Sequence, residues 1–167
     1  HAKLTNPIVD FEALPLEADW WRCDAVICAL GTTRAKAGSA AAFHRVDHDY
    51  PLAVAQAAAA HVRRGTVFLD LNSASPGTKQ QAAALIHARG ARYVEAGVMT
   101  SVPPYGVAVP MLLGGPHAAA LAPVLQAWGM DAKPVSDQLG VASAIKMCRS
   151  VMIKGLEALV IESYTTA

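Results

Sequence analysis

The sequence has few cysteines and almost no net charge, and both shortages exclude classes of protein. Three cysteines occur in 167 residues, at Cys23, Cys28 and Cys148, with no Cys-x-x-Cys pair, so a disulfide scaffold or a structural zinc site is not expected. Lys and Arg total 14 and Asp and Glu total 13, giving a net charge of +1. A chain this close to neutral has no broad basic surface, so we expect neither nucleic acid nor an anionic membrane as a partner.

Long hydrophobic runs are also missing. Gly, Pro or charged residues interrupt every apolar run well below the roughly 18 residues that a membrane-spanning helix needs, so no membrane span is expected. The chain begins His1-Ala2-Lys3-Leu4, with no initiator Met and no signal peptide. We interpret this start as that of a processed or truncated chain. The default expectation for its location is a reducing cytoplasm.

Apolar residues, in contrast, are abundant. The AVILMFWYC set makes up 53% of the chain and the mean hydropathy is +0.29. This composition excludes disorder, which requires low hydrophobicity and high net charge, and the length suits one domain with a sizeable core. The apolar surplus requires either a sheet buried on both faces or a surface that associates with another chain.

Short apolar segments alternate with alanine-rich helical segments, as in proteins built from strand–helix–strand units around a parallel sheet. Strands are expected at 7–11, 24–30, 66–71, 92–96, 107–113 and 132–135, and helices at about 41–63, 77–89, 117–128 and 139–164. Ser75-Pro76 is typical of a helix start, and Gly90 and Gly129 of helix ends. Pro110 cannot donate to a sheet, so its strand should lie near an edge or run antiparallel.

Two loops are candidate binding sites. A dinucleotide fold normally carries G-x-G-x-x-G after its first strand, and this sequence has none. The segment 31–38 follows a strand and offers backbone N–H groups, hydroxyls and two basic side chains, so it predicts either an anion site or a solvated loop. Asn72 and Ser73 follow the 66–71 strand, where ligands of open α/β sheets bind; an ordinary capped turn is the alternative.

Lys146 is the best single catalytic candidate. It lies on the polar stripe of the last helix with Ser150 one turn away, where a half-buried lysine loses proton affinity and can move a proton. The alternative is a solvated helix lysine. His44 and His48 sit at i and i+4 and could hold zinc, but Arg45 stands where the zinc proteases carry Glu. A polar helix start explains the two histidines better, and no metal is expected.

The first third of the chain resembles an atypical short-chain dehydrogenase-like NAD(P)-binding protein. The resemblance covers about residues 1–61 and rests on Ile8 to Phe11, Cys23 to Ser39 (CDAVICALGTTRAKAGS) and Phe43 to Ala58. It implies that Asp10 and Phe11 lie near the adenine, and that the strand end at Gly31 and Thr32 faces the cofactor. The Tyr-x-x-x-Lys catalytic pair of that family is missing.

The remainder, from about residue 65, resembles the β-hydroxyacid dehydrogenases related to 6-phosphogluconate dehydrogenase. The matching segments are Gly65 to Gln80 (GTVFLDLNSASPGTKQ), Gly90 to Met99, Val109 to Gly115 and Leu139 to Leu159. This resemblance implies that Asn72 and Ser73 border the nicotinamide and that Lys146 transfers the proton. The sequence departs from the family at 99–101, which replaces a Ser-Gly-Gly loop, and at Ser150, which replaces an Asn.

Together these features predict an α/β fold: a single Rossmann-like, three-layer domain over 1–167 with a mixed, mostly parallel sheet of about six strands. The usual first βαβ unit is lacking. The segments are 1–63, short-chain-dehydrogenase-like; 64–138, β-hydroxyacid-dehydrogenase-like; and 139–167, a long C-terminal helix. An apolar stripe along that helix and an open sheet edge predict a homodimer formed through one of them. The stripe comprises Val141, Ile145, Cys148, Met152, Leu156 and Leu159.

The change of family near residues 61–65 suggests a recombined or engineered chimera. Three functions then compete: a scaffold derived from NAD(P)-dependent dehydrogenases without turnover, an NAD(P)-dependent oxidoreductase acting on a small hydroxyacid through Lys146, and a nucleotide-binding module without catalysis. The missing glycine loop favours the scaffold, because that loop holds the pyrophosphate. A natural relative that spans the junction would remove the reason for a chimera.

Overall fold

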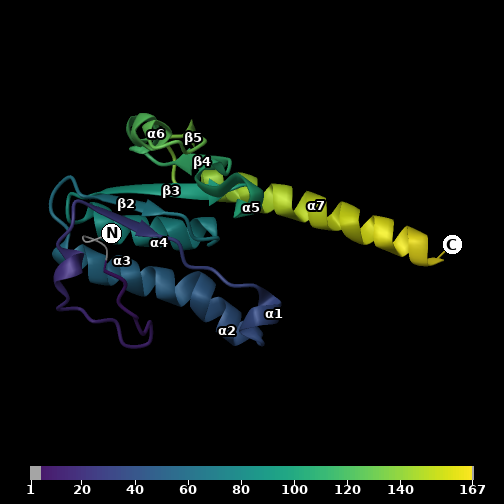
Figure 1. The fold of residues 1–167 in the computed structure, drawn as a ribbon, viewed down its shortest axis with the longest axis horizontal. Helices are drawn as coiled ribbons and strands as arrows, with labels where there is room; N and C mark the ends of the chain where they lie inside the picture. Colours follow the sequence, from purple (N-terminus) through teal and green to yellow (C-terminus); the bar gives the residue numbers. More distant parts are fainter. Residues whose placement is uncertain (1–4, 167) are drawn as a thin grey trace.

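The computed structural model describes residues 5–166 and contains a five-stranded sheet flanked by helices (Figure 1). The strands are β1 (Ala25–Cys28), β2 (Val67–Asp70), β3 (Arg92–Val98), β4 (Met111–Gly114) and β5 (Ala132–Ser136), and they lie in this order across the sheet. β1, β2 and β3 are parallel, β4 runs antiparallel to β3, and β5 is parallel to β4. The prediction of a mixed α/β, Rossmann-like sheet is confirmed.

The helices begin and end close to where the sequence signals place them. They are α1 (Arg34–Ala37), α2 (Ala40–His44), α3 (Tyr50–His61), α4 (Pro76–His87), α5 (Val102–Tyr105), α6 (Ala118–Ala127) and α7 (Val141–Thr166), with 3-10 turns at Asp19–Trp21 and Gly106–Ala108. Ser75 caps α4 by accepting a hydrogen bond from the Thr78 N–H, as expected. Gly90 and Gly129 end α4 and α6 with φ of 72° and 84°, a backbone conformation that favours glycine.

Helices cover both faces of the sheet, which explains the near-continuous apolar strands. Successive strand side chains point to opposite faces, so Phe68 and Tyr93 pack with α3 and α4, whereas Leu69 and Val94 pack with α6. The start of α7 lies on the α3–α4 face and crosses β3, β4 and β5. On the α6 face, the helix covers β4 and β5 and leaves a hollow over β1 and β2.

Three details of the prediction are wrong. Residues 7–11 form no strand, although they line a cavity together with the edge strand β1. Ile8 is fully exposed and Phe11 packs on Tyr50. The described sheet therefore has five strands rather than about six. The helix expected over 41–63 is interrupted by a π-helical turn at Arg45–Asp49. The expectation for the Pro110 strand is confirmed, since β4 starts after the proline and is antiparallel to β3.

The long helix α7 extends beyond the sheet, and residues 151–166 of it are all exposed (Figure 1). Small residues, Ala142 and Ser143, are its buried positions. Its apolar stripe faces solvent instead: Met152, Leu156 and Leu159 are each at least 60% exposed. Despite this apolar surface, none of the described helices is long and apolar enough to cross a membrane.

A buried charge pair joins β2 to α4 beneath the carboxyl end of the sheet. Lys79 and Asp70 are 0% and 2% exposed, and the Lys79 Nζ donates to Asp70 Oδ1 at 2.7 Å and to its backbone oxygen at 2.9 Å. The Tyr93 hydroxyl donates to Asp70 Oδ2, and burial raises the pKa of Tyr93. The backbone N–H of Asn72 donates to Oδ1 as well. Three donors thus satisfy this carboxylate.

Replacing Lys79 should destabilise the fold far more than replacing an exposed lysine. Lys79→Met leaves the Asp70 carboxylate buried without its counter-charge, so we expect the free energy of unfolding to fall by about 3–5 kcal/mol. Lys133→Met is the matched control. Its ammonium lies 3.3 Å from Asp131 but its side chain is 69% exposed, so its loss should be within about 1 kcal/mol. Urea unfolding followed by circular dichroism measures both, and equal losses would contradict this account.

Candidate functional site

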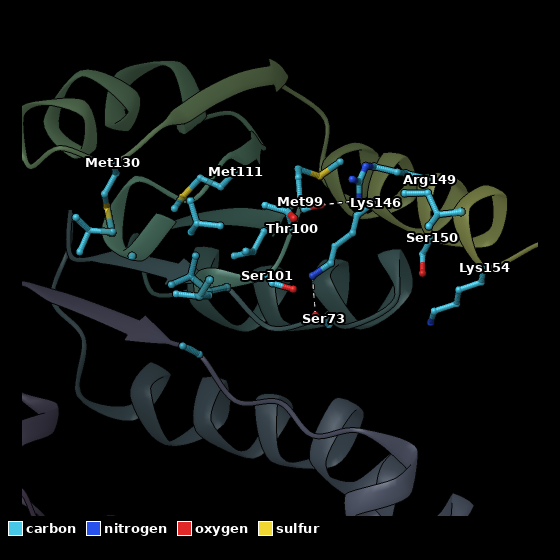
Figure 2. A pocket seen from close by; sticks show the side chains of 18 of the residues that line it. Ser73, Met99, Thr100, Ser101, Met111, Met130, Lys146, Arg149, Ser150 and Lys154 are labelled. Atoms are coloured by element: carbon cyan, nitrogen blue, oxygen red, sulfur yellow. Dashed lines mark hydrogen bonds between the residues drawn. The ribbon is translucent and has the colours of Figure 1, made fainter. Parts of the chain in front are cut away.

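The candidate site is a cleft where β1, β2 and β3 end. These strands are parallel, so the loops that follow them meet at one edge, and α7 passes beside that edge. Two adjoining cavities of ≈ 710 and ≈ 540 Å³ open there. They share Ser73 from the loop after β2 and Lys146, Ser150 and Lys154 from α7 (Figure 2). This is the end of an open α/β sheet at which ligands bind.

Lys146 reaches from the second turn of α7 toward the loop after β2, as Figure 2 shows. Its Nζ donates a hydrogen bond of 2.7 Å to the Ser73 Oγ. Partial burial lowers the pKa of Lys146 below the ordinary 10.5, and the positive charge of Lys79 lowers it further, whereas the Asp47 carboxylate opposes the shift. The two residues singled out from the sequence are therefore in direct contact, and the lysine is tuned toward its neutral form.

A buried carboxylate anchors the helix that carries Lys146. Glu95 of β3 is 0% exposed, and its Oε1 accepts hydrogen bonds from the backbone N–H groups of Gly140 (2.8 Å) and Ala142 (3.0 Å). Its Oε2 accepts from the Ser143 hydroxyl at 2.7 Å. The first turn of a helix has free N–H groups and a positive dipole end, so a carboxylate there is stabilising. Glu95 thereby fixes where α7 starts.

Two glycines leave room for this anchor. A Cβ at Gly97 would lie 3.3 Å from the Ala142 backbone oxygen and 3.6 Å from the Lys146 Cβ, so a side chain there would press α7 away from β3. A Cβ at Gly114 of β4 would overlap the Glu95 carboxylate. Both positions allow the helix to approach the sheet closely.

Asp47 also belongs to the site, although no motif in the sequence points to it. It comes from the π-helical turn and lines the ≈ 540 Å³ cavity with Lys146. Burial raises its pKa, while the Thr32 backbone N–H, by donating to the carboxylate, lowers it. Among the described residues, its Oδ1 is a buried side-chain oxygen with no hydrogen-bond partner. Such an atom is suited to a ligand that brings a donor.

The cleft is basic although the whole chain is nearly neutral. Its charged lining residues are Arg34, Lys146, Arg149 and Lys154 against Asp47 and Glu157. Arg149 also holds the loop after β3, because its guanidinium donates to the Met99 backbone oxygen (Figure 2). This excess of positive charge favours an anionic ligand such as a carboxylate or a phosphate.

The structure brings together some of the cofactor-binding residues expected from the sequence. Thr32 and Ser73 line the cleft with Lys146, and Gly31 precedes Thr32 in the same loop. Asn72 borders the cleft, but its side chain is 2% exposed and already engaged. Its Oδ1 accepts from the Leu30 N–H and its Nδ2 donates to the Cys28 sulfur at 3.2 Å. Asn72 therefore ties the loop after β2 to the end of β1.

Asp10 and Phe11 lie apart from this cleft. Phe11 stacks on Tyr50 with ring centroids 5.5 Å apart, and Asp10 Oδ1 accepts a hydrogen bond from the Glu12 N–H. Neither side chain lines the cavities that contain Lys146. Their assignment to an adenine site stays a prediction.

No family model matches the chain, and no curated protein matches it. Solved structures do. A conserved hypothetical protein from Sinorhizobium meliloti 1021 is 39% identical, with a TM-score of 0.71, over 88% of this chain and 44% of its own. The conserved protein MTH1747, described as structurally similar to 3-hydroxyacid dehydrogenases, is 31% identical, with a TM-score of 0.70, over 90% of this chain and 50% of its own.

An imine reductase from Myxococcus stipitatus in complex with NADP+ shares the fold at 18% identity and a TM-score of 0.58, over 86% of this chain and 46% of its own. The chain thus spans about half the length of these structures, 44–50%. The fold shared with MTH1747 and with this imine reductase is Rossmann-like. Neither a short-chain-dehydrogenase origin nor a chimera is confirmed; the similarity to the Sinorhizobium meliloti protein covers 88% of the chain, more than either of the two predicted segments.

The protonation of Lys146 should depend on Asp47. We expect the pKa of Lys146 to lie below 10.5. Asp47→Asn should lower this pKa further, because the Asp47 carboxylate stabilises the protonated amine and the substitution removes that stabilisation. An NMR pH titration of chains labelled with 13C at the lysine ε-carbon measures both values, and Lys146→Met identifies the resonance by removing it. A pKa that stays constant or rises in Asp47→Asn would contradict the electrostatic coupling.

Proposed function

We propose that this chain forms part of an NAD(P)-dependent oxidoreductase that acts on a small hydroxyacid, with Lys146 as the proton-transferring residue. The observation that carries the proposal is the Lys146–Ser73 hydrogen bond of 2.7 Å in a basic cleft at the strand ends, where burial lowers the pKa of the lysine. The similarity to MTH1747, itself described as similar to 3-hydroxyacid dehydrogenases, supports this class of reaction.

The described residues fit the nicotinamide half of the cofactor. The unpartnered Oδ1 of Asp47 can accept from a ribose hydroxyl or a carboxamide NH2, and the Thr32 and Ser73 hydroxyls line the same cavity. The sequence contains no G-x-G-x-x-G loop, so the fit does not extend to the pyrophosphate. When bound, NAD(P) supplies hydride transfer to or from the substrate carbon.

The chain's own residues then perform three tasks. Neutral Lys146 accepts the proton of the substrate hydroxyl during oxidation and returns it during reduction, and its lowered pKa raises the neutral fraction near physiological pH. Ser73 orients the Lys146 Nζ. Arg149 and Lys154, which line the adjoining cavity, hold the substrate carboxylate.

One observation favours a second function, nucleotide binding without turnover: Ser150 stands where the β-hydroxyacid dehydrogenases carry an Asn. The absence of a G-x-G-x-x-G loop from this sequence favours instead a scaffold without activity, because that loop holds the pyrophosphate. A binding module, or a recombined scaffold without any activity, needs no working Lys146. Cofactor binding and turnover therefore have to be measured separately.

Titration with NADPH, followed by its fluorescence, separates these functions. We expect binding that Asp47→Asn weakens by about tenfold or more, because a buried hydrogen bond to a charged group contributes about 1.5–3 kcal/mol. Lys146→Met should retain NADPH binding and abolish oxidation across a panel of small 3-hydroxyacids. If the unmodified chain binds NADPH but oxidises none of these substrates, the function is that of a nucleotide-binding module. If the chain does not bind NADPH even at millimolar concentration, the proposal is overturned and only a scaffold without activity remains.

The expected homodimer is proposed through the exposed half of α7, with a second copy of the chain as the partner. Met152, Leu156 and Leu159 recur at three- and four-residue spacing and therefore share one face of this helix. Each is at least 60% exposed, and an added Cβ at Gly155 would meet no atom within 4 Å. In an antiparallel pair centred beside Gly155, this face meets the same face of the copy, with Met152 against Leu159. An exposed apolar face of this kind favours association with a second copy.

Light scattering after size exclusion tests this pairing. We expect a mass of twice 17.5 kDa, and Leu159→Glu should return the chain to the monomer mass, because the pairing would bury the new charge. Thr165→Glu adds the same charge near the helix end and should leave the mass unchanged. A monomeric unmodified chain, or a dimer that survives Leu159→Glu, would exclude pairing through this face.

A further inference from the structure

We propose that His44, His48 and Asp49 form a binding site for a divalent metal ion of the zinc class. The three residues lie at the turn between α2 and α3, outside the ligand cleft. One ligand atom from each lies within 4.8 Å of the others. The Asp49 Oδ1 is 2.8 Å from the His48 Nδ1 and 3.5 Å from the His44 Nδ1, and the two imidazole centroids are 4.5 Å apart. Two nitrogens and one oxygen therefore converge.

The π-helical turn creates this convergence. In an α-helix each residue advances by about 100°, so Asp49 would sit about 140° around the axis from His44 and point elsewhere. The turn Arg45–Asp49 contains the wider i to i+5 hydrogen-bonded ring, which brings residue i+5 back over residue i. Asp49 thus joins the face on which His44 and His48 already lie one turn apart. π-turns are rare and occur frequently at functional sites.

The distances suit a small tetrahedral ion. Zinc binds imidazole nitrogen and carboxylate oxygen at about 2.0–2.2 Å, which separates neighbouring ligand atoms by roughly 3.4 Å. The separations of 2.8 and 3.5 Å lie close to that value, so small side-chain rotations suffice. Two imidazoles and a carboxylate favour zinc over magnesium or calcium, which prefer all-oxygen sites. The fourth position is left to water or an exogenous ligand.

The surroundings permit the ion to enter. The side chains of His44, His48 and Asp49 are 62%, 35% and 49% exposed, so the ion reaches them without displacing core residues. The same turn carries Asp47 into the cleft beside Lys146. A bound ion would therefore brace the segment that presents Asp47. The site itself is independent of the proposed oxidoreductase function and can be tested without a nucleotide.

Isothermal titration calorimetry with Zn2+ tests the site on the full chain. Two other side chains able to bind zinc are removed first by His1→Ala and Cys148→Ser, and this background is expected to bind one ion. His44→Gln and Asp49→Asn should each weaken the affinity by at least about tenfold, because each removes one of three protein ligands. His117→Gln is the matched control: it alters the other close histidine pair, whose rings are 5.8 Å apart, and should leave the affinity unchanged.

Cobalt substitution adds a structural readout. We expect the visible absorption of four-coordinate Co2+ in the background chain and its loss in His48→Gln, with circular dichroism showing that each variant is folded. Zinc binding that is unaffected by His44→Gln and Asp49→Asn would overturn the proposal. So would binding that His117→Gln abolishes, since the ion would then belong to the His87–His117 pair.

Discussion

The buried ion pair between Asp70 and Lys79 is the interaction on which the rest of the structure depends, and the Asp70 carboxylate is its centre. It lies at the end of β2, fully inside the protein, and its three hydrogen-bond donors come from α4, β3 and the loop that follows β2. A buried charge is tolerated only when it is paired and hydrogen-bonded, so these elements have to meet in one arrangement. Because Asn72 and Ser73 follow Asp70 directly, the network also positions the loop that contacts Lys146.

Glu95 plays the corresponding part on the neighbouring strand. It accepts hydrogen bonds from the free backbone N–H groups at the start of α7 and so determines where along the sheet the helix begins. Two buried carboxylates on adjacent strands thus hold α4 and α7 at the same sheet edge, and the cleft lies just beyond them. Such satisfied buried networks favour a unique packing, which suits a site whose lysine and serine come from positions 73 residues apart.

Local signals were sufficient for most of the fold. The apolar runs at 24–30 and 66–71, the Ser75-Pro76 cap and the stops at Gly90 and Gly129 depend on neighbouring residues alone, and the structure follows them. The segment 7–11 shows the limit of such signals, because this apolar run forms no strand although it lines a cavity with the edge strand β1. Likewise, no local sequence signal indicates the π-helical turn inside the helix expected over 41–63.

The sequence by itself determined the order of strands and helices, the polar stripe that carries Lys146 and the placement of Asn72 and Ser73 at a strand end. Only the tertiary structure decided that Asn72 is used for packing, that Asp47 and Arg149 join Lys146, and that Asp49 turns toward His44 and His48. Periodicity and capping act over a few residues and can be read along the chain. Contacts between distant segments, and the burial that changes a pKa, depend on how the helices pack on the sheet.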